Sequence, residues 1–367
     1  MQRVAVQAGP KVVTPASEVW GTMAPDAAAQ KAVHQYIERH SRQVLDEKLF
    51  GDRIVAFLYS KAREEASVLM RLLTSARLSS LLGFLSFDMP LARNLSGSTR
   101  FLRSCGVDLT ECLWPPEAFR TPRQIFERQI RYWMCRPMPE EAGVIVSPAD
   151  SRMVAGSFAD ASLVRLKGKF FELEELLQKK AWSDVFAKGD WAVFRLTPEQ
   201  YHYNHLPVSG RVADIYMCSG VYHSCNPSAV IEWATPFSKN RRLVTILDTD
   251  VPGGSGVGLV AMVEVVALMI GDLRQCYSKR YYDDPQRLEV GMFVDRGQPK
   301  SLFRPGSSTD VLIFEPGRLE LDPDLIANQR RGDVASRFSS AFGRPWVETE
   351  VRVRSRIGRA LPRRALV

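Results

Sequence analysis

Residues 259–268 read LVAMVEVVAL, and this stretch decides what kind of fold the chain can form. The apolar run around it, residues 257–271, is interrupted by Glu264 and rich in valine, which is typical of a buried strand. No run of about 18 uninterrupted apolar residues occurs in the sequence, so a membrane-spanning helix is not expected. The preceding segment, VPGGSGVG at residues 251–258, lacks the lysine of a P-loop and precedes a strand, which predicts a hairpin loop.

Short β-rich runs separated by Gly, Pro, Asn and Asp follow one another from about residue 144 onward. Besides residues 259–268, these runs are 144–146, 191–196, 243–247 and 311–314. One short helix is expected at residues 173–179, because glutamates at 172, 174 and 175 stand at its start. The expected fold class is α+β, with a helical N-terminal region followed by a mostly antiparallel β catalytic domain.

The N-terminal region is expected to be helical because residues 27–48 and 52–85 carry helix formers with apolar positions three to four residues apart. Between residues 68 and 85 the only charged residues are arginines, so a helix there presents a broad apolar face with a basic and hydroxyl edge. That composition, centred on residues 66–87, suits the surface of an anionic bilayer. A helix packed on its own domain or on a partner subunit accounts for it equally well.

The chain carries an excess of positive charge, since 49 Lys and Arg against 41 Asp and Glu give a formal net charge of +8. This balance favours an anionic partner such as nucleic acid, anionic lipid or an acidic small molecule. From residue 350 on, six arginines and one glutamate predict a solvated, disordered tail. No aromatic residue is interleaved with these arginines to stack on bases, so nucleic-acid binding is not expected.

The six cysteines form no CxxC pair, so a zinc ribbon is not expected and a reducing compartment is the simpler interpretation. Residues 1–20 lack the compact apolar segment of a secretory signal, whereas an organelle-targeting segment stays open. The predicted parts of the chain are an N-terminal extension (1–50), a helical, membrane-associating region (51–140), a catalytic domain (141–350) and a basic tail (351–367).

The dipeptide Gly306-Ser307, within RPGSST at residues 304–309, is a candidate bond for self-cleavage. A serine that follows glycine can attack the carbonyl carbon of its own preceding peptide bond. β-Elimination of the resulting ester and hydrolysis of the dehydroalanine leave a pyruvoyl group at the new N-terminus. That ketone is an electron sink of the kind that pyridoxal phosphate provides elsewhere. Gly-Ser-Ser is also common in plain surface turns, which is the simpler interpretation of this segment taken alone.

Two other segments carry groups suited to proton transfer. Asp150 ends the turn SPAD at residues 147–150, where its plain interpretation is a carboxylate that caps backbone amides. His202 and His205 lie three residues apart, and general acid–base chemistry is their better functional interpretation, with two structural histidines as the alternative. No metal site is expected, because His223 is 18 residues further on and no HExxH pattern occurs.

Taken in this order, the segments resemble the phosphatidylserine decarboxylase family. That family carries an SPAD turn, a YH-x-x-H-x-P-V-x-G segment, an NP turn and a G-S-[ST] processing site. Here the four motifs stand at residues 147–150, 201–210, 226–227 and 306–308. Weaker similarities extend the resemblance to about residues 65–350, with departures such as Ser151 in place of the family's glycine after SPAD. The head-group pocket is therefore expected to differ from that of the family.

The resemblance implies that Asp150 and His205 form the charge pair that activates Ser307 for attack on the Gly306 carbonyl. Cleavage would leave a β chain of residues 1–306 and an α chain that begins with a pyruvoyl cofactor derived from Ser307. The substrate amine would form a Schiff base with this ketone and lose carbon dioxide. His202 or His205 would then protonate the resulting carbanion.

The expected function is decarboxylation of phosphatidylserine to phosphatidylethanolamine by a peripheral enzyme on the cytoplasmic side of an anionic phospholipid membrane. The resemblance also implies a homodimer of processed protomers. One alternative is a decarboxylase of a free, possibly aromatic, amino acid with the same pyruvoyl cofactor. A second alternative is an unprocessed homologue that binds a lipid surface without catalysis.

Overall fold

The computed structural model describes residues 33–47, 107–159, 171–220, 227, 236–266, 272–305 and 308–362. The helix expected at residues 52–85 lies outside them, as do Gly306, Ser307 and residue 226 of the NP turn. The helices within the described ranges are all too short or too polar to cross a membrane.

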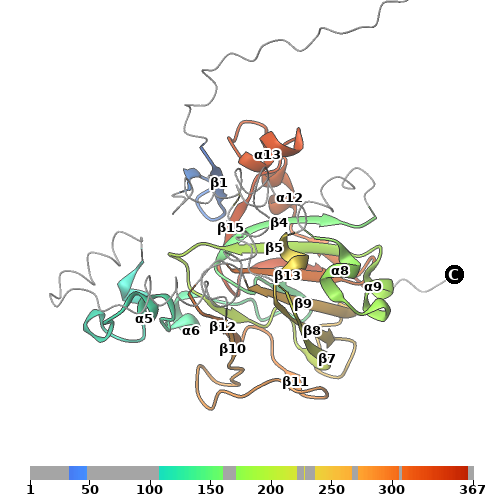
Figure 1. Cartoon of the computed structure of the whole chain (residues 1–367), viewed down its shortest axis with the longest axis horizontal. Helices are drawn as coiled ribbons and strands as arrows, with labels where there is room; N and C mark the ends of the chain where they lie inside the picture. Colours follow the sequence, from blue (N-terminus) through green and yellow to red (C-terminus); the bar gives the residue numbers. More distant parts are fainter. Residues whose placement is uncertain are drawn as a thin grey trace, which may run out of the picture. The chain divides into compact units, whose positions relative to one another are not determined.

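Ten of the described strands form one sheet, in the order β11-β7-β8-β9-β13-β5-β4-β15-β1-β2 (Figure 1). These strands are β1 (Gln35–Glu38), β2 (Val44–Asp46), β4 (Ser151–Ser157), β5 (Asp190–Leu196), β7 (Gly210–Cys218), β8 (Arg242–Asp248), β9 (Leu259–Val266), β11 (Phe293–Val294), β13 (Ser308–Phe314) and β15 (Thr349–Val351). Every neighbouring pair is antiparallel except β1 and β15. The predicted antiparallel β domain is thus confirmed.

Most residues of the central strands β9 and β13 are apolar because both faces of the sheet are covered. On β13, Val311 and Ile313 belong to one core cluster, whereas Leu312 and Phe314 belong to a second cluster on the opposite face. The described part of the apolar run, residues 259–266, forms β9 directly beside β13. The predicted hairpin loop at residues 251–258 is confirmed, since it joins the antiparallel pair β8 and β9.

Helices cover the first face, where α8 (Leu173–Leu177) and α9 (Lys180–Phe186) bury their apolar side chains in the first cluster. The helix expected at 173–179 is therefore confirmed, although it ends at Gln178 in a left-handed conformation. The other described helices are α5 (Pro122–Phe126), α6 (Tyr132–Cys135), α11 (Pro236–Lys239), α12 (Pro323–Gln329) and α13 (Arg337–Phe342), with two short 3-10 turns at Leu109–Glu111 and Pro116–Ala118.

Two small sheets lie on the second face. One contains β10 (Leu273–Gln275), β12 (Pro299–Phe303) and β6 (Tyr203–His205), and the other contains β14 (Leu319–Leu321), β16 (Arg356–Ala360) and β3 (Val144–Val146). Ile145, Leu319 and Ile357 of the second small sheet join the second core cluster. The first small sheet carries both candidate histidines and leads into the candidate scission bond.

The helix expected over residues 27–48 is wrong for the part that the structure describes, because this part forms the hairpin β1–β2. Ile37 is completely buried and pairs with Thr349 of β15 in a parallel register. The Glu38 carboxylate accepts hydrogen bonds from the amides of the turn, and Arg42 adopts a left-handed conformation with φ 59°. Pairing with a distant strand and turn chemistry here outweigh a weak local preference for helix.

The basic segment from residue 350 is not a disordered tail over its described part. It contributes the end of β15 and the whole of β16, and Val353 and Ile357 are completely buried. Arg356 forms an ion pair with Asp322, with an N–O distance of 2.9 Å, and Arg359 pairs with Glu320. The alternation of apolar residues with arginines is therefore the period of an amphipathic strand, and two of its arginines, Arg356 and Arg359, are paired with carboxylates.

Candidate active site

The candidate scission bond lies between two strands of different sheets. Strand β12 ends at Phe303 and is followed by Arg304 and Pro305, and β13 begins at Ser308 between β5 and β9. Ser308 and Phe303 are almost completely buried. The described residues on either side of Gly306 and Ser307 are thus anchored in the β12 and β13 ladders, close to the centre of the fold.

The register of β6 against β12 distinguishes the two candidate histidines. His205 pairs with Pro299, whereas the backbone carbonyl of His202 accepts a 3.0 Å hydrogen bond from the amide of Phe303. Four residues of strand separate Pro299 from Phe303, which corresponds to about 13 Å. His202 therefore lies opposite the end of β12 that leads directly to Gly306, and His205 lies further back.

The His202 ring is buried and has one free nitrogen. It stacks on Phe126 with 3.6 Å between ring centroids, and its Nδ1 donates a 2.8 Å hydrogen bond to the carbonyl of Gln200. No described residue is a hydrogen-bond partner of Nε2. Burial, aided by the charge of Arg128, holds the pKa of His202 well below its usual value. The neutral ring thus presents an unpartnered lone pair, which can accept a proton.

The His205 ring has partners at both nitrogens. Its Nδ1 donates to the carbonyl of Gly297 at 2.8 Å, which leaves Nε2 to accept from the Tyr201 hydroxyl at 3.0 Å. Burial lowers the pKa of His205 to about 3, so this ring is also neutral at physiological pH. The edge of the ring meets Tyr132 at a centroid distance of 4.7 Å.

Asp150 is held by an arginine that the sequence argument did not identify. Its carboxylate accepts hydrogen bonds from Arg136 at 2.7 to 3.2 Å and from the amide of Val353 at 2.8 Å. In the part of the chain that the structure describes, Asp150 and His205 share no hydrogen bond, although the charge of Asp150 opposes the lowering of the pKa of His205. The relay Asp150–His205–Ser307 stays a prediction.

A buried polar cluster behind the candidate bond joins the first small sheet to the central sheet. The Glu264 carboxylate on β9 accepts hydrogen bonds from Lys300 and Ser301 of β12 and from Asn204 of β6. Asp310 of β13 lies directly opposite Glu264, and neither of its carboxylate oxygens has a partner among the described residues. Burial and the charge of Glu264 raise the pKa of Asp310 well above its usual value, which favours the protonated form of this carboxyl group.

Unpartnered polar atoms gather next to the candidate bond. The Ser308 hydroxyl has no described partner, and Ser308 projects from the same face of β13 as Asp310 because the two residues are two apart. His202 Nε2 is a third such atom. Buried polar atoms in folded proteins normally have a hydrogen-bond partner, so these atoms without a described partner are available to bind another group. The sequence contains one indication of the Glu264 cluster. Lys300 and Asp310 are charged residues within or directly before strands whose other residues are mostly apolar.

A potential metal-ligating group lies elsewhere, where single ligand atoms of His34, Glu47 and Glu348 come within 4.8 Å of one another. Arg195 donates hydrogen bonds to both carboxylates at 2.6 to 2.9 Å, and Arg152 pairs with Glu47 at 2.6 Å. Two arginines already neutralise the two carboxylates. We therefore assign this group to an ion-pair network that fastens the β1–β2 hairpin to the central sheet.

The buried neutral histidines predict an acid-sensitive fold. Between pH 6.5 and about 3 the unfolded chain binds a proton at position 205 and the folded chain does not, so the free energy of unfolding falls as the pH falls through this window. For His205 alone the expected loss between pH 7 and pH 5 is about 2 kcal/mol. Urea unfolding of the uncut Ser307→Ala chain at both pH values measures the loss, which His205→Gln in the same background should reduce by that amount. An identical pH dependence in both chains would contradict the assignment.

Comparison with known proteins matches residues 123–339 to the family model described as phosphatidylserine decarboxylase. A phosphatidylserine decarboxylase proenzyme of Anaeromyxobacter is 33% identical over 277 residues, which cover 71% of this chain and 93% of the relative. A proenzyme of the same name from Fusobacterium nucleatum is 27% identical over 315 residues, 84% of this chain and 97% of the relative. Phosphatidylserine decarboxylase proenzyme 2 of rice is 34% identical over 229 residues, 61% of this chain, but the match spans only 34% of that longer relative.

Proposed function

The chain belongs to the phosphatidylserine decarboxylase family and is a carboxy-lyase of that type, and we propose that it matures by cutting its own Gly306–Ser307 bond. The observation that carries the proposal is that the segment matched by the family model contains all the candidate catalytic residues. Residues 123–339 include Asp150, both candidate histidines and the Gly306-Ser307 dipeptide. The substrate is phosphatidylserine, and the products are phosphatidylethanolamine and carbon dioxide.

The processing step uses only groups of this chain and water. The Ser307 hydroxyl attacks the Gly306 carbonyl carbon, the C–N bond breaks, and an ester replaces the peptide bond. Removal of the α-proton of residue 307 expels the Gly306 carboxylate and leaves a dehydroalanine, from which water releases ammonia to give the pyruvoyl group. Asp150 and His205 activate the serine, and for this His205 Nε2 exchanges its hydrogen bond to Tyr201 for one to Ser307.

The surroundings of residue 307 suit a pyruvoyl group. A ketone in a buried site needs hydrogen-bond partners, and the Ser308 hydroxyl and His202 Nε2 are buried polar atoms without a partner among the described residues. Ser308 follows residue 307 in the chain, and the carbonyl of His202 accepts a hydrogen bond from the amide of Phe303. The pyruvoyl group supplies an electron sink that bonds the substrate amine and takes up the electrons released with carbon dioxide. His202 Nε2, which has no partner among the described residues, accepts a proton from the substrate ammonium group and returns it to the substrate carbon.

We include binding to an anionic phospholipid membrane in the proposal. The enzyme would act as a peripheral protein on the cytoplasmic side and as a homodimer of processed protomers. Support comes from the bilayer location of the substrate, the net charge of +8 and the basic composition of residues 66–87, which lie outside the described residues.

Denaturing mass spectrometry of the purified wild-type protein tests the proposal, together with carbon dioxide release from phosphatidylserine vesicles. Two fragments are expected, a β chain of residues 1–306 and an α chain of 61 residues, 307–367, with a blocked N-terminus. Carbon dioxide should come from phosphatidylserine and not from free serine or tryptophan. An intact chain of 41.3 kDa would reject self-processing, and activity confined to a free amino acid would reject the lipid substrate.

A further inference from the structure

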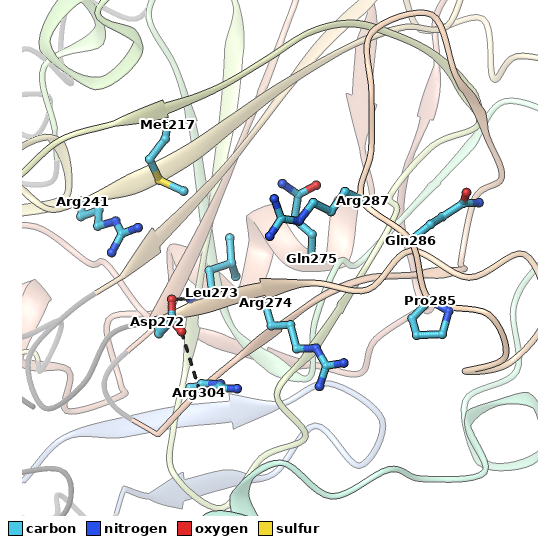
Figure 2. A pocket seen from close by; sticks show the side chains of 10 residues that line it. All are labelled: Met217, Arg241, Asp272, Leu273, Arg274, Gln275, Pro285, Gln286, Arg287 and Arg304. Carbon is cyan, nitrogen blue, oxygen red and sulfur yellow. Dashed lines mark hydrogen bonds and ion pairs between the residues drawn. The ribbon is translucent and has the colours of Figure 1, made fainter.

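A cavity of about 580 Å³ opens beside the end of β12 (Figure 2). Its lining includes four arginines, Arg241, Arg274, Arg287 and Arg304, together with Asp272 and Met217. The volume is in the range of sites for small molecules, which is roughly 300–1,000 Å³. The four arginines come from separate segments of the chain, and the fold brings them together around this cavity.

The lining carries a large excess of positive charge, since Asp272 is its one acidic residue against four arginines. Arg274 and Arg287 are exposed, and neither forms an ion pair with any residue that the structure describes. Arg304 has only long contacts with carboxylates, at 3.9 Å to Asp272 and 4.0 Å to Glu127. A concave surface with this charge attracts an anion, and guanidinium groups bind phosphate oxygens through paired hydrogen bonds.

The cavity is close to the proposed reaction centre. Arg304 follows β12 directly, and its amide donates a 2.9 Å hydrogen bond to the carbonyl of Asp272. Only Pro305 separates Arg304 from Gly306 in the chain, so their Cα atoms lie at most about 7 Å apart. In Figure 2 the side chains of Arg304 and Asp272 face each other at one edge of the hollow.

One edge of the cavity is apolar, because the Met217 side chain is 46% exposed there and Leu273 lies nearby. Phosphatidylserine has its amine and carboxylate a few bonds from an anionic phosphodiester, which in turn carries the apolar glycerol esters. The cavity matches that order of groups. Its arginines correspond to the phosphodiester, its apolar edge corresponds to the glycerol esters, and Arg304 in its lining precedes residue 307 by three positions in the chain. A free serine or tryptophan has no phosphodiester, and its one anionic group is the carboxylate that the reaction removes.

We propose that this cavity is the phosphodiester subsite, in which Arg274 and Arg287, with Arg304 beside them, bind the phosphate of the glycerophospholipid substrate. This inference rests on the proposed function, because it assumes that a phospholipid amine reacts at residue 307. The arginines position the lipid and take no part in proton transfer.

Glycerophosphoethanolamine is a suitable probe, since it carries the phosphodiester but no carboxylate that can be lost. Isothermal titration of the full-length purified protein at low salt should show binding of this probe and none of ethanolamine. The double variant Arg274→Gln/Arg287→Gln should bind at least about tenfold more weakly, as expected for lost charge-assisted hydrogen bonds. Arg359→Gln is the matched control, because Arg359 is exposed on β16 and does not line the cavity.

A kinetic measurement separates substrate binding from chemistry. In mixed micelles the double variant should show a KM for phosphatidylserine raised about tenfold with kcat nearly unchanged, because the arginines bind the lipid equally before and during reaction. Its extent of self-cleavage should equal that of the wild type. The single variants Arg274→Lys and Arg287→Lys should lose less affinity than the corresponding Gln variants, because lysine keeps the charge but not the paired hydrogen bonds of the guanidinium group.

Unchanged affinity in the double variant, or no binding of the probe by the wild type, would overturn the subsite. Inorganic phosphate that binds as tightly as the probe would assign the cavity to free phosphate and overturn the lipid assignment. Failure of the proposed function is seen separately as an uncut wild-type chain in the mass spectrum. Probe binding can still be measured on such a chain, so the two failures are distinguishable.

Discussion

Ser307→Ala is expected to remain a single chain of 367 residues and to release no carbon dioxide from phosphatidylserine. The substitution removes the hydroxyl that attacks the Gly306 carbonyl, and an alanine cannot be converted to a pyruvoyl group. Both processing and decarboxylation should therefore be lost completely. Denaturing mass spectrometry after prolonged incubation gives the first result, and carbon dioxide release gives the second.

Ser308→Ala is the matched control for Ser307→Ala. The adjacent serine has the same chemistry, but its hydroxyl is buried in β13 without a described partner, so its loss should leave processing intact. A Ser307→Ala chain that still splits would mean that the scission bond is elsewhere. If Ser308→Ala alone blocked cleavage, the bond would instead be Ser307–Ser308.

Substitution of the two histidines is expected to impair different steps, self-cleavage for His205 and decarboxylation for His202. His205→Gln should yield an uncut chain, because His205 activates Ser307 before any pyruvoyl group exists. His202→Gln should yield both fragments, with decarboxylation slowed by about 10²- to 10⁴-fold, the usual contribution of a general acid or base. The free Nε2 of His202 and its position opposite Phe303 are the reasons for this assignment.

Mass spectrometry and single-turnover decarboxylation on each variant measure the two steps independently. Tyr203→Phe is a suitable control, since Tyr203 lies between the histidines on β6 and its hydroxyl contacts Gln129 at 3.3 Å, away from the scission bond. A cut His205→Gln chain together with an uncut His202→Gln chain would exchange the two roles. Normal processing and normal turnover in both variants would remove the histidines from the mechanism.

Much of the β domain follows from local patterns. An apolar run rich in valine predicts a strand covered on both faces, and β9 and β13 are such strands because their apolar side chains alternate between two core clusters. The candidate residues Asp150, His202, His205 and Ser307 also stand in short motifs whose chemistry depends on residue type and spacing. These features are visible in the sequence because neighbouring residues alone produce them.

The N-terminal hairpin shows where local patterns stop being sufficient. Residues 35–38 carry no strong preference for strand, and their conformation is set by β15, whose residues lie more than 300 positions further along the chain. The arginines after residue 350 look like a solvated tail until Val353 and Ile357 are seen to be buried. In both places long-range pairing supplies the free energy that decides the local structure.

The sequence by itself determined the family, four strands of the central sheet (β5, β8, β9 and β13) and the dipeptide proposed as the scission bond, since all three depend on residues close together in the chain. Only the tertiary structure decided that Asp150 meets Arg136, that Glu264 meets Lys300, and that four separate arginines line one cavity. The reason is physical. A motif records which groups are available, whereas burial and long-range strand pairing decide which groups are partnered and which are left free to react.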